Sequence, residues 1–387
     1  MTVGDHATPA ITGGDPLAGW LAECDEPTGY LDFARIGPPL VAVRAARARA
    51  LTDATRAAPG WLERLDATAV DTRHRAGALC GVPASAVALV PSTTAGLFAV
   101  AFGLPGNGTM LVPEGEFPAN VVPWLRAADR GGPRVRRVPR SGDGRLVPAA
   151  VRERLDGGVV GLTVSAVDYA TGHRRDLAAL RALLGPERLL VVDAIQGYGV
   201  DELDLAVADV VVSGGQKWLR AGWGAAVLAV RPEAADRVSA VLGGWPGLID
   251  PYGEHWPAET TDETGRLLMS NTDPEAVAGL GAALALASRA GLSALTSRLR
   301  AVVDEVRTLL LAAGAEVRGA SWPRVERGPI VAFRMPGETP EVTQARLTAA
   351  GLTVAVRGDA VRLSPHVSTT SATLTVLSRA LRYGADR

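Results

Sequence analysis

The chain has 387 residues and a formal net charge of -1, with 47% hydrophobic and 21% charged residues. These proportions are typical of a globular chain with a large core, exclude disorder for most of it, and argue against a nucleic-acid partner. No apolar run of about 18 residues occurs, and the first 20 residues lack the basic and apolar segments of a secretion signal, so we expect a cytoplasmic protein without a membrane span.

The predicted elements begin with residues 1–50, where we find no clear helix or strand and expect the YLDFARIGPPL stretch to lie over a site. From about residue 87 to 230, short β-rich runs alternate with helix-like segments, which is typical of a largely parallel sheet covered by helices. A helix is expected after the last of these strands, at residues 232–242. The expected strands are residues 87–90, 109–113, 134–138, 159–167, 188–194, 208–213 and 224–230.

Residues 243–274 are polar and rich in Gly, Pro and Trp, which predicts a long functional loop. A long helical stretch interrupted near Gly291 follows, and then a strand, a helix, a hairpin and a helix. We therefore expect an N-terminal segment (residues 1–50), a large domain (residues 51–285) and a small α+β domain (residues 286–387).

Lysine is almost absent, because Lys217 is the only lysine among the 40 lysines and arginines. A coding bias toward arginine explains most of this scarcity. Arginine cannot replace a lysine that must lose its proton and condense with an aldehyde, because a guanidinium stays charged. The retained lysine therefore indicates a chemical role, with a plain surface lysine as the alternative.

Reactive side chains follow two neighbouring strands. Asp193 and Gln196 end one strand, and Ser213 and Lys217 end the next. Ligands of open α/β sheets bind at the carboxyl ends of strands, so a carboxylate and an amine would face one cleft. The alternative is an aspartate that caps a helix.

Two other strand ends carry candidates. Thr93 and Thr94 lie between a strand and a helix, where hydroxyls and free N–H groups suit a helix cap or a bound phosphate. Phe117 follows the next strand, and its ring would fill the core or a lid, or stack on a planar cofactor. Neither Cys24 nor Cys80 belongs to a CxxC pattern, and the five histidines are scattered, so we expect no disulfide framework and no metal.

Taken together, VVDAIQGYG, ADVVVSGGQKWLRAGWGAAVLAV and these strand ends resemble the class V aminotransferase family of fold-type I enzymes that use pyridoxal 5'-phosphate (PLP). The resemblance implies an α/β fold with a large, mostly parallel sheet and a smaller C-terminal domain. It also implies a homodimer with the active site at the interface and an amino-acid substrate. Lys217 would bind PLP covalently, Asp193 would pair with the pyridine nitrogen, and Gln196 would face the phenolic oxygen.

The resemblance implies further contacts with the cofactor. The hydroxyls of Thr93, Thr94 and Ser213 would bind the phosphate, although Gly214 stands where the family has a Ser or Thr. Phe117 would stack on the ring, and Asp168 and Tyr169 of the DYATG segment would face the cofactor.

Two later segments would complete the site. Asn271 and Thr272 of MSNTDP would reach the PLP phosphate of the partner subunit. Arg362 of AVRLSPHVSTT would bind the substrate α-carboxylate, with Arg357 as a helper.

The reactions of the family share removal of the substrate α-proton by the freed lysine amine. A cysteine desulfurase needs a mobile cysteine in the C-terminal part, but both cysteines lie before residue 81. The GEFPAN and AVRLSPHVSTT segments resemble actinobacterial lyases of cysteine S-conjugates, such as hercynylcysteine sulfoxide lyase and the PLP enzymes of lincosamide antibiotic pathways. We therefore expect β-elimination that breaks a carbon–sulfur bond, in thiol or antibiotic metabolism.

Other outcomes stay open on sequence alone. They are decarboxylation-coupled oxidation to an aldehyde, kynureninase-like cleavage, transamination or epimerisation, and a catalytically silent scaffold. The loop residues Trp245, Tyr252, His255 and Trp256 would suit a large substrate side chain, or form a packed lid.

Overall fold

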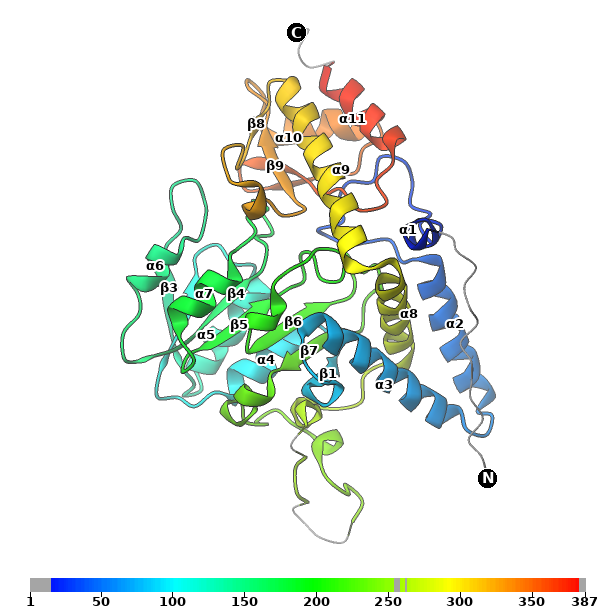
Figure 1. Cartoon of the computed structure of the whole chain (residues 1–387), viewed down its shortest axis with the longest axis vertical. Helices are drawn as coiled ribbons and strands as arrows, with labels where there is room; N and C mark the ends of the chain where they lie inside the picture. Colours follow the sequence, from blue (N-terminus) through cyan, green and yellow to red (C-terminus); the bar gives the residue numbers. More distant parts are fainter. Residues whose placement is uncertain (1–14, 254–257, 262, 383–387) are drawn as a thin grey trace.

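The computed structural model describes residues 15–253, 258–261 and 263–382 (Figure 1). A seven-stranded sheet has the strand order β1-β7-β6-β5-β4-β2-β3, and β7 runs antiparallel to both of its neighbours while the pairs from β6 to β3 are parallel. All seven predicted strands are confirmed. They are β1 (Val87–Val90), β2 (Thr109–Pro113), β3 (Arg134–Val138), β4 (Val159–Ser165), β5 (Leu189–Asp193), β6 (Val210–Gly214) and β7 (Ala226–Val230).

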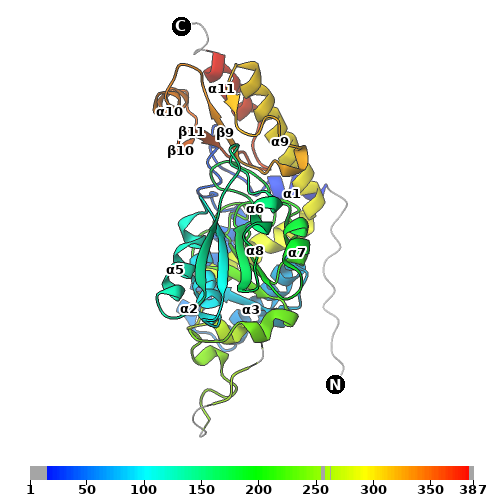
Figure 2. The ribbon, with the colours of Figure 1, turned by 90° about the vertical axis from the view of Figure 1, so that its left-hand side faces the viewer.

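Helices cover both faces of this sheet, which Figure 2 shows nearly edge-on. Alternate residues of a strand point to opposite faces. Accordingly, Val192 belongs to a buried cluster with Leu180 of α7, whereas Val191 belongs to a second cluster with Trp124 of α5. Burial on both faces explains the continuous runs of Val, Leu and Ala. The α-helices of this part are α2 (Val41–Arg56), α3 (Trp61–Cys80), α4 (Thr93–Gly103), α5 (Val122–Ala128), α6 (Pro148–Arg152), α7 (Leu177–Leu184) and α8 (Pro274–Ala290).

A small antiparallel sheet forms the upper part of Figure 1, with the strand order β10-β11-β9-β8. The predicted helix, strand and hairpin order of this part is confirmed. Its elements are α9 (Leu292–Ala312), β8 (Glu316–Val317), β9 (Val331–Arg334), α10 (Pro340–Ala349), β10 (Ala355–Arg357), β11 (Ala360–Leu363) and α11 (Ser371–Arg382).

The helical stretch breaks at Gly291, as expected, where a φ of +81° suits glycine. Among the described residues no single helix is long and apolar enough to cross a membrane. Taken together, α8 and α9 have the length and composition of a membrane span, but the two helices meet at an angle of 86°. The predicted boundary after residue 285 falls inside α8, and the three-part division stays a proposal.

Two expectations about elements are wrong. The first 50 residues contain α1 (Pro16–Leu21) and the start of α2. Residues 232–242, expected to be an α-helix, form only the 3₁₀ helix η4 (Pro232–Arg237).

The stretch predicted to be a long loop is mostly irregular. It contains the 3₁₀ helices η5 (Trp245–Gly247) and η6 (Thr264–Leu267) and projects at the bottom of Figure 1. His255 and Trp256 lie outside the described residues.

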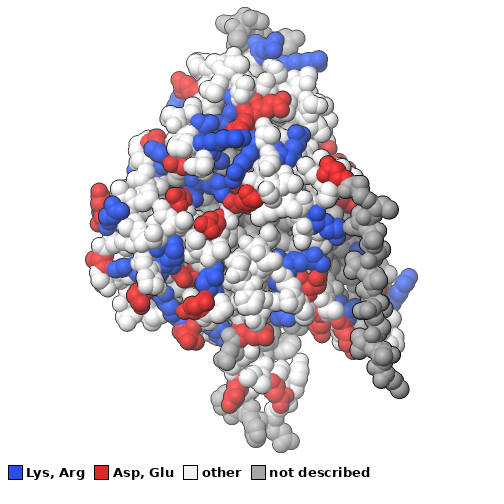
Figure 3. Space-filling model, viewed as in Figure 1, with Lys and Arg blue, Asp and Glu red and all other residues white. Residues whose placement is uncertain are grey.

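The YLDFARIGPPL segment (residues 30–40) forms backbone hydrogen bonds both to the small domain and to the loop after β6. The amide of Leu31 donates to the carbonyl of Thr353, and the amide of Gly37 donates to the carbonyl of Gln216. The N-terminal segment therefore joins the lysine loop to the small domain. Figure 3 shows side chains of both charge signs mixed over one face of the molecule.

Candidate active site

A cavity of about 260 Å³ opens at the carboxyl ends of the parallel strands. It gathers nine of the predicted site residues from segments far apart in the sequence. Its lining consists of Ala34, Arg35, Ser92, Thr93, Thr94, Phe117, Ala119, Tyr169, Asp193, Ile195, Gln196, Gln216, Lys217, Arg357 and Arg362.

Burial shifts the pKa values of the Asp193 carboxyl and the Lys217 amine in opposite directions. Asp193 is 2% exposed, and burial raises the pKa of its carboxyl to about 6, although the amide of Ile195 donates to Oδ1 at 3.0 Å. Burial lowers the pKa of the Lys217 amine to about 8, against the opposing effect of the Asp193 charge. Within the described part of the chain, Lys217 forms no ion pair; its Nζ lies 5.5 Å from the centroid of the Phe117 ring. The lysine is therefore an amine that loses its proton near neutral pH.

The loop that carries Lys217 is fixed on two sides. A Cβ on Gly37 would lie 2.2 Å from the carbonyl oxygen of Lys217, so this close approach requires glycine. On the other side, Nε2 of His366 lies 2.9 Å from the carbonyl oxygen of Trp218. Burial lowers the pKa of His366 to about 3, so the ring is neutral and carries on Nε2 the proton that it donates to this carbonyl.

A buried arginine ties the same loop to both ends of the chain. Arg220, which is fully buried, pairs with Glu26 at 2.7 Å and donates to the hydroxyl of Ser368 at 3.2 Å. Its φ of +57° is a conformation that non-glycine residues seldom adopt. The lysine loop is thus held by side chains that lie far away in the sequence.

Gln196 makes two contacts that orient its amide. Its Oε1 accepts from Nε1 of Trp218 at 2.8 Å, and its Nε2 donates to the carbonyl of Ala34 at 3.1 Å. One amide proton is left for a further acceptor.

The N-terminus of α4 forms another wall. Ser92 caps the helix by accepting from the amide of Ala95 at 3.1 Å, and the hydroxyl of Thr93 accepts from the amide of Gly214 at 2.8 Å. The first helical hydrogen bond runs from the Gly96 amide to Ser92, so the amides of Thr93 and Thr94 precede it. The Ser92 cap uses only the amide of Ala95, so the amides of Thr93 and Thr94 can still donate to a bound anion.

A buried arginine forms the opposite wall. Arg362 is 2% exposed, donates to the carbonyl of Tyr169 at 2.9 Å and pairs with Asp32 at 2.8 Å. Burial lowers the pKa of its guanidinium, and Asp32 opposes that effect. Arg357 lies on the neighbouring strand of the same hairpin, half-buried. The Phe117 ring meets Tyr169 edge-on, at 5.1 Å between centroids.

Four predicted residues do not line this cavity. Asp168 accepts from the amide of Thr171 at 2.7 Å and pairs with Arg140 at 2.6 Å. Burial acts to raise its pKa, but the charges of Arg175 and Arg140 outweigh that effect and lower it. Its carboxylate thus holds a turn in place and does not line the Lys217 cavity, and the expectation that it faces the cofactor stays a prediction. The hydroxyl of Ser213 is fully buried and lies 3.4 Å from the carbonyl of Gly214.

The other two lie on a separate groove. Asn271 and Thr272 line an apolar groove of about 500 Å³ beside α3. The hydroxyl of Thr272 donates to the carbonyl of Leu89, and Asn271 is exposed. One chain alone does not bring them to the Lys217 cavity.

Sequence reasoning missed a buried ion pair behind Asp193. Glu116 and Arg175 pair at 2.8 Å with both side chains 1% exposed, and the amide of Ser165 donates to Glu116 at 3.2 Å. Ser165 stands opposite Asp193 in the β4–β5 register. The signal was present as charges in GEFPAN and GHRRDL, but only the fold brings them together. Arg35, Asp32 and Gln216 were also missed.

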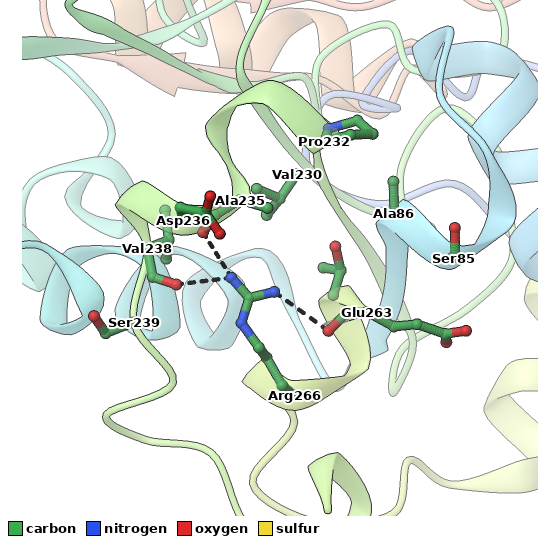
Figure 4. A pocket seen from close by; sticks show the side chains of 11 residues that line it. Ser85, Ala86, Val230, Pro232, Ala235, Asp236, Val238, Ser239, Glu263 and Arg266 are labelled. Carbon is green, nitrogen blue, oxygen red and sulfur yellow. Dashed lines mark hydrogen bonds between the residues drawn. The ribbon is translucent and has the colours of Figure 1, made fainter. Parts of the chain in front are cut away.

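A larger cavity of about 580 Å³ lies at the opposite edge of the sheet (Figure 4). There the guanidinium of Arg266 donates to the carbonyls of Ala235 at 2.7 Å and Val238 at 3.0 Å. These bonds join η6 to the segment after β7, a structural role away from Lys217.

The aminotransferase class-V family model matches residues 49–380 of the chain. The chain belongs to this family. A relative from Mycobacterium tuberculosis (strain CDC 1551 / Oshkosh), described as "Probable hercynylcysteine sulfoxide lyase", is 31% identical over 331 residues, which cover 80% of this chain and 78% of that protein. A "Probable cysteine desulfurase" of Vibrio cholerae is 29% identical over 125 residues, or 31% of each chain.

Two solved structures share the fold. The apo cysteine desulfurase from Thermococcus onnurineus NA1 superposes with a TM-score of 0.82 at 20% identity, over 92% of this chain and 94% of that one. The complex between the cystine C–S lyase C-DES and its product cysteine persulfide gives a TM-score of 0.83 at 17% identity, over 92% and 97%. The predicted family, fold class and cofactor are thereby confirmed.

The chain is a PLP-dependent class V enzyme, and its cavity fits that cofactor. The Lys217 amine suits the aldehyde of the cofactor, and the buried Asp193 carboxylate suits its ring nitrogen. The N-terminus of α4, with its hydroxyls, suits the phosphate, and the aromatic ring of Phe117 in the cavity wall suits stacking on the cofactor ring. We infer from this donor set that Lys217, Asp193, Thr93, Thr94 and Phe117 hold PLP.

Proposed function

We propose that this chain is a PLP-dependent lyase that breaks the carbon–sulfur bond of a cysteine S-conjugate by β-elimination. The observation that carries the proposal is the Lys217 amine, with a pKa of about 8, in one cavity with Asp193 and Arg362. The relative described as a sulfoxide lyase, which matches four fifths of the chain, supports the carbon–sulfur chemistry.

Each wall of the cavity has a part in this reaction. Arg362 and Arg357 bind the substrate α-carboxylate, and Asp193 holds a proton on the ring nitrogen of the cofactor. When bound, PLP supplies a cationic ring that accepts the electron pair left on the substrate α-carbon. Gln196 orients the cofactor with its remaining amide proton.

Lys217 moves the protons. Its neutral amine removes the α-proton of the substrate, and the bond between Cβ and sulfur then breaks with both electrons leaving on sulfur. The resulting Lys217 ammonium returns a proton to the leaving thiolate, or to a sulfenate when the substrate is a sulfoxide. Water converts the remaining 2-aminoacrylate to pyruvate and ammonia, so no oxidant is needed.

The cysteines support elimination over desulfuration. A desulfurase needs a cysteine that receives sulfur at the cofactor, yet neither Cys24 nor Cys80 lines the Lys217 cavity. Burial raises the pKa of both thiols to about 12, so neither is a ready nucleophile.

A homodimer is part of the proposal. The groove that carries Asn271 and Thr272 is lined by apolar side chains of α3, and Leu62 of this helix is 56% exposed. A second copy on this groove would cover it and place Asn271 toward the phosphate of the partner subunit's cofactor. Trp245 and Tyr252, both exposed, would then border a large substrate side chain. The pathway and the cytoplasmic location stay predictions.

Product analysis tests the proposed reaction. The holoenzyme is incubated with S-alkyl cysteine conjugates and, separately, with kynurenine. We expect pyruvate and thiol from the conjugates and no product from kynurenine. Formation of alanine and anthranilate from kynurenine, or of an aldehyde and CO2 from the conjugates, would replace β-elimination with another reaction.

A further inference from the structure

The Lys217 cavity carries more positive charge than one α-carboxylate requires. Arg35, Arg357 and Arg362 line it together with Lys217, whereas Asp193 is the one acidic residue of its lining. Because Asp193 is assigned to the ring nitrogen of the cofactor, no acidic residue of the lining is left to balance the three arginines.

The three arginines differ in how their charge is balanced. Arg362 is paired with the buried Asp32 at 2.8 Å. Arg357 donates only to the adjacent carbonyl of Val356, at 2.7 Å, and among the described residues Arg35 has no side-chain hydrogen bond or ion pair. Within the ranges that the structure describes, two positive charges at the cavity thus lack a carboxylate partner.

These arginines also lie at graded depths. Arg362 is buried, Arg357 is half-buried and Arg35 is exposed. An α-amino acid that places its α-carboxylate on the deep pair, Arg362 and Arg357, directs its side chain from Lys217 toward the cavity mouth. Arg35 then stands beside the sulfur substituent, not beside the α-carbon.

Hydrogen bonds hold the backbone around Arg35 in place. The amides of Arg35 and Ile36 donate to the carbonyl of Asp32, at 3.0 and 3.3 Å, and the hydroxyl of Tyr30 donates to the carbonyl of Ile36 at 2.7 Å. The carbonyl of Ala34 accepts from Gln196. The turn is therefore anchored beside Gln196, and it fixes the backbone position of Arg35 in the cavity lining.

We propose that Arg35 binds a second carboxylate, carried by the sulfur substituent, so that the preferred substrates are dianionic cysteine S-conjugates. This inference rests on the proposed function and names its substrate class. An Arg guanidinium matches a carboxylate with two parallel N–H donors, and such charge-assisted bonds are about twice as strong as neutral ones. The cofactor phosphate is a poorer occupant, because the α4 N-terminus already supplies its donors at Thr93 and Thr94.

Matched substrates test the proposal. S-(carboxyalkyl)-L-cysteines of increasing chain length are compared with the carboxamides of the same length, using holoenzyme. Binding is read from the absorbance change of the bound cofactor, and turnover from pyruvate. We expect the acid of the best length to exceed its amide at least about tenfold in Kd and in kcat/KM, which is about 1.4 kcal/mol. Added salt should reduce this preference, because the rim is exposed to solvent.

Arg35→Gln should bring the ratio of acid to amide to about one, because the variant should weaken the acid more than the amide. Arg152→Gln is the matched control, since Arg152 is an exposed arginine of α6 outside the cavity. A wild-type ratio near one, a ratio that survives in Arg35→Gln, or equal losses for acid, amide and PLP affinity would each overturn the proposal. Loss of pyruvate from every conjugate with the binding preference intact would instead reject β-elimination and leave the role of Arg35 standing.

Discussion

The rate at which the apoprotein captures PLP should report the lowered pKa of Lys217. Only the neutral amine attacks the aldehyde. With a pKa of about 8, about a tenth of the amine is neutral at pH 7; at the ordinary value of 10.5 the neutral share would be about 0.03%. The lowered pKa therefore raises the neutral share of the amine at pH 7 about 300-fold over that of an ordinary lysine, and capture at pH 7 should be correspondingly favoured.

The assay is the pH dependence of that rate, followed by the absorbance of the lysine-bound cofactor. The rate should rise about tenfold per pH unit and level off above about pH 8. Asp193→Asn should move the bend to lower pH, because the Asp193 charge raises the pKa of Lys217; Arg357→Gln should move it to higher pH, because the Arg357 charge lowers it. Borohydride trapping followed by peptide mapping should find the adduct on Lys217 alone. A bend near pH 10.5, or shifts of the same sign in both variants, would refute this reasoning.

Three further outcomes follow from the structure. Asp32→Asn should lower the free energy of unfolding by about 3–5 kcal/mol in urea titrations of the apoprotein, because it leaves Arg362 buried without a charge partner. Adding Arg362→Gln should recover much of that loss without restoring substrate affinity. An unchanged urea midpoint in Asp32→Asn would contradict the pairing. Replacing Cys24 and Cys80 together by alanine should leave pyruvate formation intact, whereas a sulfur-carrier mechanism would form alanine in the wild type and lose that product in the double variant. Leu62→Arg should yield monomers with weaker PLP binding in sedimentation measurements, and an intact dimer would place the interface elsewhere.

The strands were predictable because the large sheet is buried on both faces. Except for the edge strand β3, which holds three arginines, each strand is a short apolar run, and that pattern depends little on tertiary contacts. Residues 232–242 show the limit of such patterns. Their apolar spacing suits a helix, but the guanidinium of Arg266 takes the carbonyls of Ala235 and Val238, which a continuing α-helix would use for its own amides.

Side-chain partners were harder to predict than strand ends. Asp193 and Lys217 could be singled out because Asp193 is the last residue of β5 and Lys217 comes shortly after the end of β6. Asp168 also follows a strand, yet its carboxylate forms an ion pair with Arg140. Nothing in the DYATG sequence itself indicates that partner. Arg35 was missed for the converse reason, since it reaches the cavity only through a turn that docks on the Gln196 amide.

The most direct test of the account is the amount of pyruvate and thiol released from one cysteine S-conjugate by the wild-type holoenzyme and by Lys217→Ala. If Lys217 removes the α-proton and the carbon–sulfur bond then breaks, the wild type forms pyruvate and thiol in equal amounts and the variant forms neither. Thiol without pyruvate, or equal amounts of both from the Lys217→Ala variant, would contradict the account.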